Sequence, residues 1–140
     1  MHRKLLCTTL VGNRCDLLII TERCKDIEDN RTKPVIILSA RIHPGESNSS
    51  FMMHGFINFL TSECEEAVKL RKSFVFKLVP MLNPDGVIHG NYRCSIAGTD
   101  LNRRYLDANP IIHPTVSALK ELLKTSQDSR GVLLLSLIHI

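Results

Sequence analysis

Apolar positions along the chain form short continuous runs that alternate with longer stretches at helical spacing. The continuous β-branched run at 34–40 (PVIILSA) is typical of a strand buried on both faces. Further strands are predicted for the opening residues up to 11 and for 16–21, 74–81 and 131–135. Helices are predicted for 51–60, for 64–72 and from Pro114 onward, where proline suits the first helical turn. The polar stretch 25–33 predicts a surface turn.

This alternation of strands and helices predicts an α/β fold with a mixed, largely parallel sheet flanked by helices. In open sheets of this kind, ligands bind at the carboxyl ends of the strands. Two polar turns follow predicted strands directly, one after Ala40 and the other after Leu82. We therefore expect any site chemistry of this chain to lie in these two turns.

The composition argues against several classes of function. Lys and Arg number 18 against 14 Asp and Glu, and the resulting net charge of +4 is too small and too dispersed to predict nucleic-acid binding. No apolar run approaches the roughly 20 residues that cross a bilayer, so no membrane partner is expected. The cysteines at 7, 15, 24, 64 and 94 include no C-x-x-C pair, which argues against a zinc finger and favours reduced thiols in a cytosolic protein.

The first turn contains His43-Pro44-Gly45-Glu46, which places an imidazole and a carboxylate three residues apart. A histidine nitrogen and a glutamate oxygen suit a borderline metal such as Zn²⁺. The spacing alone also fits an ordinary turn histidine beside a surface glutamate, but its position after a buried strand favours the metal. A catalytic zinc normally takes three protein ligands and a water, so His43 and Glu46 supply two of them.

None of the other histidines has a clear claim to be the third ligand; they are His2, His54, His89, His113 and His139. His54 is predicted on the surface of a helix, and His113 is predicted where the last helix begins. His89 follows the second turn and stays open as an alternative.

The second turn is Asn83-Pro84-Asp85-Gly86, and Arg93 and the polar run 102–104 (NRR) follow it. Guanidinium groups bind carboxylates through two parallel hydrogen bonds, and asparagine adds a further donor. An arginine near a metal also stabilises a developing oxyanion. Taken alone, the run at 102–104 fits a solvated polar loop equally well.

The two turns together resemble the zinc metallocarboxypeptidase family, whose pattern is H-x-x-E after a strand, then N-P-D-G, an arginine and an N-R pair. The wording of 40–50 (ARIHPGESNSS), 74–95 (FVFKLVPMLNPDGVIHGNYRCS) and 100–106 (DLNRRYL) is similar to one branch, the cytosolic carboxypeptidases. Members of that branch trim glutamates from tubulin tails. The resemblance extends over most of the chain, from about residue 5 to about residue 134.

The resemblance implies a role for each matching residue. His43 and Glu46 would be ligands of one Zn²⁺ in each complete domain. Arg93 would polarise the scissile carbonyl and stabilise the oxyanion, while Asn102 and Arg103 would hold the terminal carboxylate of the substrate. The implied reaction is attack by a zinc-activated water with the help of a general-base glutamate. The implied partner is a protein with an acidic tail, such as tubulin, in the cytosol and on microtubules.

Two parts of the family site, the third zinc ligand and the general-base glutamate, are not found in the sequence. The last six residues, 135–140 (LSLIHI), resemble the translation of a sequencing-library transposon end. We therefore expect residues 1–134 to be the N-terminal part of a metallocarboxypeptidase catalytic domain, with a sheet incomplete at its C-terminus, and 135–140 to be a non-native tail. Two alternatives stay open: another zinc amidohydrolase of the same fold, such as a desuccinylase or aspartoacylase, and a truncated product that binds tubulin without catalysis.

Overall fold

The computed structural model of the chain describes residues 1–22 and 32–138. Most of the predicted turn at 25–33 lies outside these residues. The strands are β1 (His2–Thr8), β2 (Arg14–Ile20), β3 (Val35–Ala40), β4 (Val75–Val79) and β5 (Val132–Ile138). The helices are α2 (Ser47–Thr61), α3 (Glu65–Ser73), α4 (Pro84–His89), the 3₁₀ turn η1 (Leu101–Arg103) and α5 (Pro114–Arg130). Each predicted strand and helix is therefore present, with ends shifted by a few residues.

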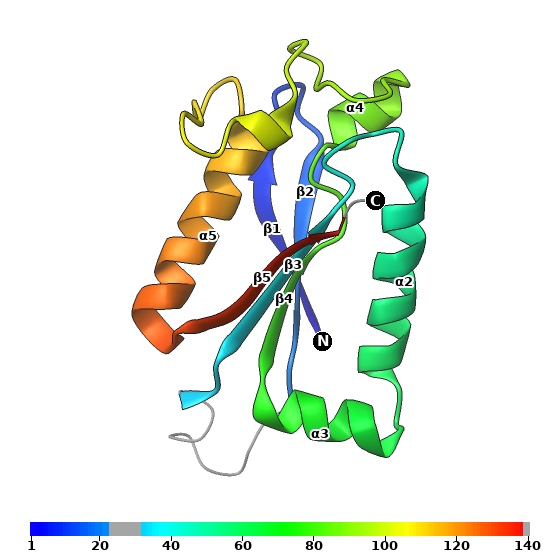
Figure 1. Cartoon of the computed structure of the whole chain (residues 1–140), viewed down its shortest axis with the longest axis vertical. Coiled ribbons are helices and arrows are strands. Elements are labelled where there is room, and N and C mark those ends of the chain that lie inside the picture. The colour runs from blue at the N-terminus through cyan, green and yellow to red at the C-terminus, as the bar shows by residue number, and fades with distance from the viewer. Residues whose placement is uncertain (23–31, 139–140) are drawn as a thin grey trace.

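The described strands form one sheet in the order β1-β2-β4-β3-β5. β3 is parallel to both β4 and β5, whereas β2 is antiparallel to β1 and to β4. This arrangement confirms the predicted mixed sheet. Because β3 and β4 are parallel neighbours, the turns that follow them meet at the same edge of the sheet, at the upper end of the molecule in Figure 1.

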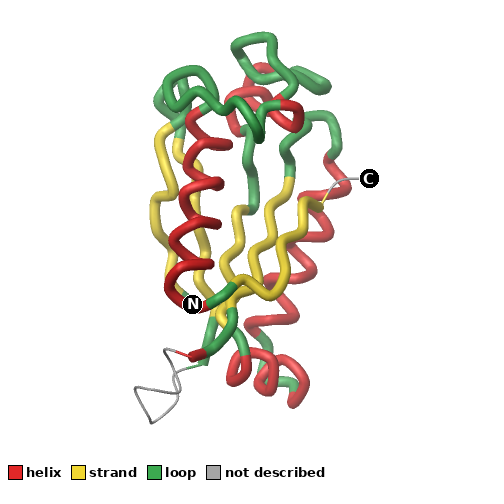
Figure 2. Tube along the Cα trace, turned by 60° about the vertical axis from the view of Figure 1, so that its left-hand side comes forward, coloured by secondary structure: helices red, strands yellow, loops and turns green. Residues whose placement is uncertain are grey.

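Helices cover both faces of the sheet, with α5 on one side and α2 and α3 on the other (Figures 1 and 2). Alternate residues of β3 point to opposite faces, as the strand period requires. Val35 and Ile37 pack in a cluster that includes Leu119 of α5. Leu38 packs in the opposite cluster, which includes Met53 of α2. The prediction that this strand is buried on both faces is confirmed.

One predicted turn is wrong in detail. Pro84–His89 forms the short helix α4, and Asn83 caps it by accepting a hydrogen bond from the backbone N–H of Gly86 at 3.0 Å. The residues that favour a turn here, asparagine followed by proline, are also the preferred first residues of a helix. The helix therefore begins where the turn was expected.

The apolar spacing of 51–60 correctly predicts a helix, but most of its aromatic residues do not face the sheet. Ser49, Met53 and Leu60 are the buried residues of α2. Phe51 is 75% exposed, and Phe56 and Phe59 are exposed as well.

Strand β5 continues beyond the predicted end at 135 and pairs with β3 as far as Ile138, which lies opposite Ala40. That 135–140 is a non-native tail stays a prediction. Within the described ranges, no helix is long and apolar enough to cross a membrane.

Candidate metal and substrate site

Backbone hydrogen bonds hold the turns after β3 and β4 against each other. The N–H of Leu82 donates to the carbonyl of Ala40 at 2.9 Å, and the N–H of Asn83 donates to that of Arg41 at 3.1 Å. The amide Nδ2 of Asn83 donates to the carbonyl of Ile42 at 3.2 Å. The two turns in which site chemistry was expected therefore lie side by side at one edge of the sheet.

Two glycines allow the segments to approach closely. A Cβ atom on Gly86 would lie 2.5 Å from Cγ of Pro44, and one on Gly45 would lie 2.4 Å from the ring of Tyr92 and 2.8 Å from its carbonyl oxygen. The N–H of Gly45 donates to that same carbonyl at 2.7 Å. Only glycine leaves room for this packing, so the first turn is locked to α4 and to the loop behind it.

Arg41 closes the first turn from the other side. Its φ of +57° is unusual for a residue other than glycine and carries a backbone cost. Its Nε donates to the carbonyl of Pro44 at 2.7 Å, and its Nη1 donates to Oγ of Ser50 at 2.8 Å. These contacts compensate the backbone cost and hold the turn around His43.

His43 is buried, at 3% exposed, and its ring lies between two carboxylates. Nδ1 is 2.9 Å from Oε1 of Glu46, and Nε2 is 3.0 Å from Oδ1 of Asp100. A neutral imidazole has only one N–H, and ionised carboxylates only accept. One of the two nitrogen–oxygen contacts therefore has no hydrogen between its atoms, unless the ring is charged or a cation lies between them.

Asp100 is the residue that the sequence reasoning missed, although it begins the DLNRRYL segment. Its second oxygen accepts from Nε of Arg93 at 2.8 Å, and Oδ1 also accepts from the backbone N–H of Asn102 at 2.9 Å. Burial alone would raise the pKa of Asp100, but the hydrogen bonds from His43, Asn102 and Arg93 outweigh it and hold this pKa below its usual value. An ionised Asp100 is therefore the partner expected to orient His43. The available signal was that a ligand histidine needs a carboxylate or carbonyl on its other nitrogen.

The residues of the first turn fit a zinc ion. Two donors on one tetrahedral zinc lie about 3.4 Å apart for bonds near 2.1 Å, so a small movement of the 2.9 Å pair admits the metal. In the described part of the chain, Oε2 of Glu46 is buried without a hydrogen-bond partner, which a cation would satisfy. A cation bound to Nδ1 of His43 would also take the place of the hydrogen that one of its two contacts lacks.

A third ligand is not brought to this pair. Among the described residues, no group of three His, Cys, Asp or Glu side chains is placed to hold a metal. His54 and His89 are exposed on α2 and α4, and Nδ1 of His113 accepts from the backbone N–H of Asn109. His139 lies outside the described residues.

The predicted substrate residues follow Asp100 directly. Asn102 and Arg103 lie on η1, and the side chain of Arg103 is exposed. Arg93 is 46% exposed and is joined to Asp100 through Nε. The Asp100 contacts thus connect Arg93 and Asn102 to His43, and Arg103 follows on the same turn.

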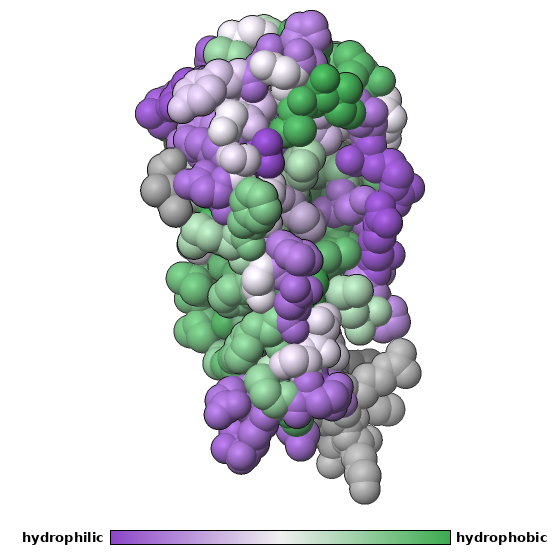
Figure 3. All heavy atoms as spheres, turned by 90° about the vertical axis from the view of Figure 1, so that its right-hand side faces the viewer, coloured by the Kyte–Doolittle hydropathy of each residue, from purple (hydrophilic) through white to green (hydrophobic). Residues whose placement is uncertain are grey.

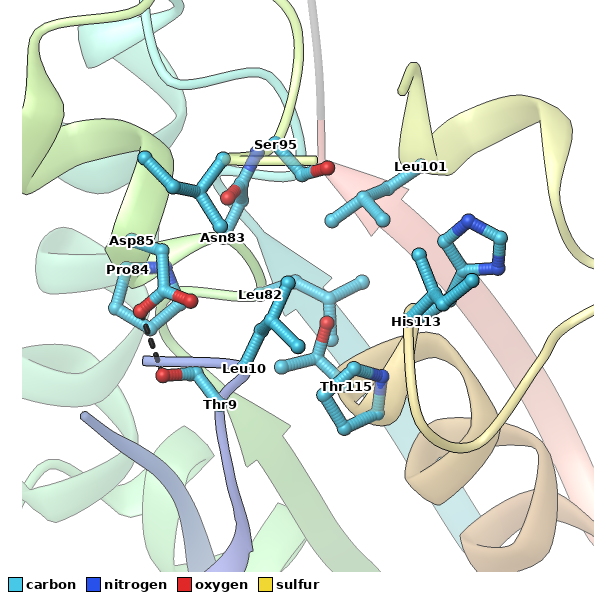
Figure 4. A pocket seen from close by; sticks show the side chains of 13 residues that line it. Thr9, Leu10, Leu82, Asn83, Pro84, Asp85, Ser95, Leu101, His113 and Thr115 are labelled. Atoms are coloured by element: carbon cyan, nitrogen blue, oxygen red, sulfur yellow. Dashed lines mark hydrogen bonds between the residues drawn. The ribbon is translucent and has the colours of Figure 1, made fainter. Parts of the chain in front are cut away.

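A small cavity lies beside η1, between the β1–β2 hairpin, α4 and the start of α5 (Figure 4). On its hairpin side, the hydroxyl of Thr9 and the amide Nδ2 of Asn13 donate to Oδ1 of the buried Asp85. Asp85 therefore ties the hairpin to α4. The sequence did not indicate this role, because Asp85 is more than 70 positions away from both Thr9 and Asn13.

The fold and these residues define a class of protein. The zinc carboxypeptidase family model matches residues 1–129, and the chain belongs to that family. Its similarity to curated relatives places it in the branch of the cytosolic carboxypeptidases. It is 52% identical over 124 residues to cytosolic carboxypeptidase 1 of Danio rerio and 48% identical over 134 residues to cytosolic carboxypeptidase 2 of Mus musculus.

The matched regions cover 85% and 96% of this chain but only 11% and 16% of those two relatives. The chain thus spans a small part of the length of the proteins that it resembles.

Solved structures show the same fold. A putative carboxypeptidase A from Shewanella denitrificans superposes with a TM-score of 0.87 at 27% identity, covering 99% of this chain and 34% of that one. A metallo-carboxypeptidase from Pseudomonas aeruginosa gives 0.83 at 30% identity, over 98% and 35%. An aspartoacylase family protein from Mesorhizobium loti gives 0.67 at 14% identity, over 96% and 38%, and this shows only a shared fold. The family match therefore favours the carboxypeptidase over the amidohydrolase alternative.

Proposed function

We propose that this chain supplies the zinc-binding turn and the carboxylate clamp of a metallocarboxypeptidase. The proposed substrates are C-terminal or side-chain-linked glutamates on proteins such as tubulin, in the cytosol and on microtubules. The observation that carries the proposal is the continuous contact from Glu46 through His43 and Asp100 to Arg93. It joins two metal-type donors to a guanidinium group within one cluster of loops.

In this proposal, Nδ1 of His43 and the carboxylate of Glu46 hold the zinc, which when bound supplies an activated water and a Lewis acid for the scissile carbonyl. Asp100 accepts a hydrogen bond from the N–H at Nε2 of His43 and so keeps Nδ1 available for the metal. A third ligand and the general-base glutamate are expected from outside the described residues.

The two arginines would bind negative charge at different stages of the reaction. Arg103 and Asn102 hold a carboxylate that is charged throughout the reaction. Arg93, oriented by Asp100, faces a carbonyl oxygen whose charge develops only in the transition state. The arginines on one loop suit an acidic substrate tail, because opposite charges speed encounter and fix orientation.

The test compares Arg103→Ala with Arg93→Ala in a protein that contains this chain within a complete family domain. We expect Arg103→Ala mainly to raise KM, since a charge-assisted hydrogen bond contributes about 1.5–3 kcal/mol. We expect Arg93→Ala mainly to lower kcat. Release of glutamate from a polyglutamylated peptide is the measurement.

Lys69→Ala is the matched control, because Lys69 is an exposed cation on α3 whose ion pair, within the described part of the chain, is with its neighbour Glu65. It should change neither constant. Unchanged hydrolysis by Arg103→Ala would contradict the clamp. Equal activity on peptides without glutamate at the terminus would contradict the proposed substrate class.

A further inference from the structure

The β1–β2 hairpin places two cysteines directly opposite each other. Cys7 and Cys15 are register partners in this antiparallel pair. Opposed residues in such a pair have Cα atoms about 4.5–5.5 Å apart, and a disulfide spans roughly 4.4–6.8 Å between Cα atoms. The register pairing therefore predicts a Cα spacing within the range of a disulfide.

The two thiols are in contact but differ in their surroundings. They lie near enough for each thiol to affect the acidity of the other. Cys15 is 0% exposed, with its Sγ 3.5 Å from the carbonyl of Met81, whereas Cys7 is only partly buried at the edge of the sheet. A reagent in solution can therefore reach Cys7 first.

The proximity of the two thiols shifts their pKa values in opposite directions. The hydrogen bond from Cys15 lowers the pKa of Cys7, against the opposing effects of burial and of the nearby Asp85. The pKa of Cys15 is raised by its hydrogen bond to Cys7 and by burial. The accessible thiol is thus also the one that more readily becomes a thiolate, which is the reactive form.

We propose that Cys7 and Cys15 are a redox-active thiol pair that closes reversibly into a cross-strand disulfide on reaction with a small-molecule disulfide of the glutathione class. The Cys7 thiolate attacks one sulfur of that reagent, forms a mixed disulfide and releases one thiolate. Cys15 then loses its proton, attacks Sγ of Cys7 and releases the second thiolate. The pair loses two electrons and two protons, and the reagent is reduced to two thiols.

The remaining described cysteines offer no comparable pairing. Cys64 is exposed immediately before α3, and Cys94 lies in the loop after α4. The proposed bond would link β1 to β2 just below Thr9 and Asn13, which hold Asp85. Closure is therefore expected to stiffen the support of α4.

The experiment equilibrates the folded 140-residue chain in buffers with graded ratios of oxidised to reduced glutathione, blocks free thiols and digests with trypsin. Cleavage after Arg14 puts the two cysteines in separate peptides, 5–14 and 15–23, so the disulfide appears as a linked pair. We expect that pair to dominate and to form at a ratio roughly tenfold lower than in urea, because folding holds the thiols together. The thermal midpoint of the oxidised chain should be higher by several degrees.

The control Cys64→Ser should leave the linked pair unchanged, while Cys7→Ser should abolish it without unfolding the chain. Cys15→Ala serves if serine at the buried position destabilises the fold. The proposal is overturned if glutathione stays attached as a stable mixed disulfide. It is also overturned if bonds to Cys64 or Cys94 form as often, or if closure needs the same ratio in urea.

Discussion

At the scale of single residues, His43 shows how a side chain receives its role from its neighbours. The H-x-x-E spacing supplies the contact with Glu46, but the partner on Nε2 comes from Asp100, 57 positions along the chain. A neutral imidazole has one N–H, so it cannot donate to both carboxylates. A metal bound to the nitrogen without hydrogen would fill that gap. The zinc assignment therefore rests on three residues, of which the motif contains two.

Asp100→Asn should weaken zinc binding by about 10–100-fold, the usual effect of removing the partner that orients a ligand histidine. His43→Ala should abolish it. Competition with a chromophoric chelator, using a protein that contains the complete domain, measures the affinity, and elemental analysis gives the metal content.

The control for this prediction is Asp107→Asn, which removes a charge from the same loop. Asp107 is exposed and pairs only with Arg104 among the contacts described. Zinc affinity should stay within a factor of about two of the unmodified protein, a change below 0.5 kcal/mol. If Asp107→Asn and Asp100→Asn behaved alike, the orienting role of Asp100 would be wrong.

At the scale of elements, the site depends on contacts between segments that the chain order keeps apart. The β1–β2 hairpin reaches α4 through Asp85, which accepts from Thr9 and Asn13 and is itself buried. α4 in turn carries Gly86, which leaves room for Pro44 of the turn that contains His43 and Glu46. The hairpin is thus a support of the candidate site, although none of its residues touches His43 or Glu46 in the contacts described.

Asp85→Ala should lower the free energy of unfolding by about 1–3 kcal/mol, because it leaves the buried hydroxyl of Thr9 and the partly buried amide of Asn13 without their acceptor. Urea denaturation of the 140-residue chain measures this. Asp128→Ala, at an exposed position of α5, is the matched control and should change the value by less than about 0.5 kcal/mol. An equal loss in both variants would refute the anchoring role of Asp85.

At the scale of the whole molecule, one face keeps a large apolar surface exposed. In the view toward α2, apolar side chains form an extended area (Figure 3). Phe51 and Phe59 of α2 are exposed, and on the edge strand β5, whose successive side chains point to opposite faces, Leu133 is 63% exposed and Leu134 and Leu135 are exposed as well. Exposed patches and open edges of this kind promote association. That residues 1–134 are part of a larger catalytic domain stays a prediction.

We expect the 140-residue chain alone to have no peptidase activity, even with added zinc. The described residues provide two proposed metal ligands where catalytic sites use three, and loss of a general base typically costs roughly 10²–10⁴-fold. The assay is release of glutamate from a polyglutamylated peptide, with His43→Ala as the background. Zinc-dependent turnover that persists in residues 1–134 would contradict the expectation and direct attention to His89 as a ligand.

Local pattern and motif order were enough to predict the α/β fold, the strands and helices, and the two turns in which the candidate residues lie. Strand periodicity and parallel pairing are dictated by neighbouring residues and by sheet geometry. Local signals gave the wrong element where the same residues favour two kinds of structure. Asparagine and proline at 83–84 suit a turn, but they also suit the start of the helix that forms there. The apolar spacing of α2 likewise could not tell which face meets the sheet.

The tertiary structure alone decided the long-range partners. Asp100 beside His43, Asp85 beneath the hairpin and Cys7 opposite Cys15 are contacts between segments brought together by the register and order of the sheet. No local signal encodes such a pairing, because the energy of a hydrogen bond depends on where two groups finally lie and not on their spacing along the chain. The sequence by itself therefore determined which kinds of groups are present, and the fold determined which of them act on each other.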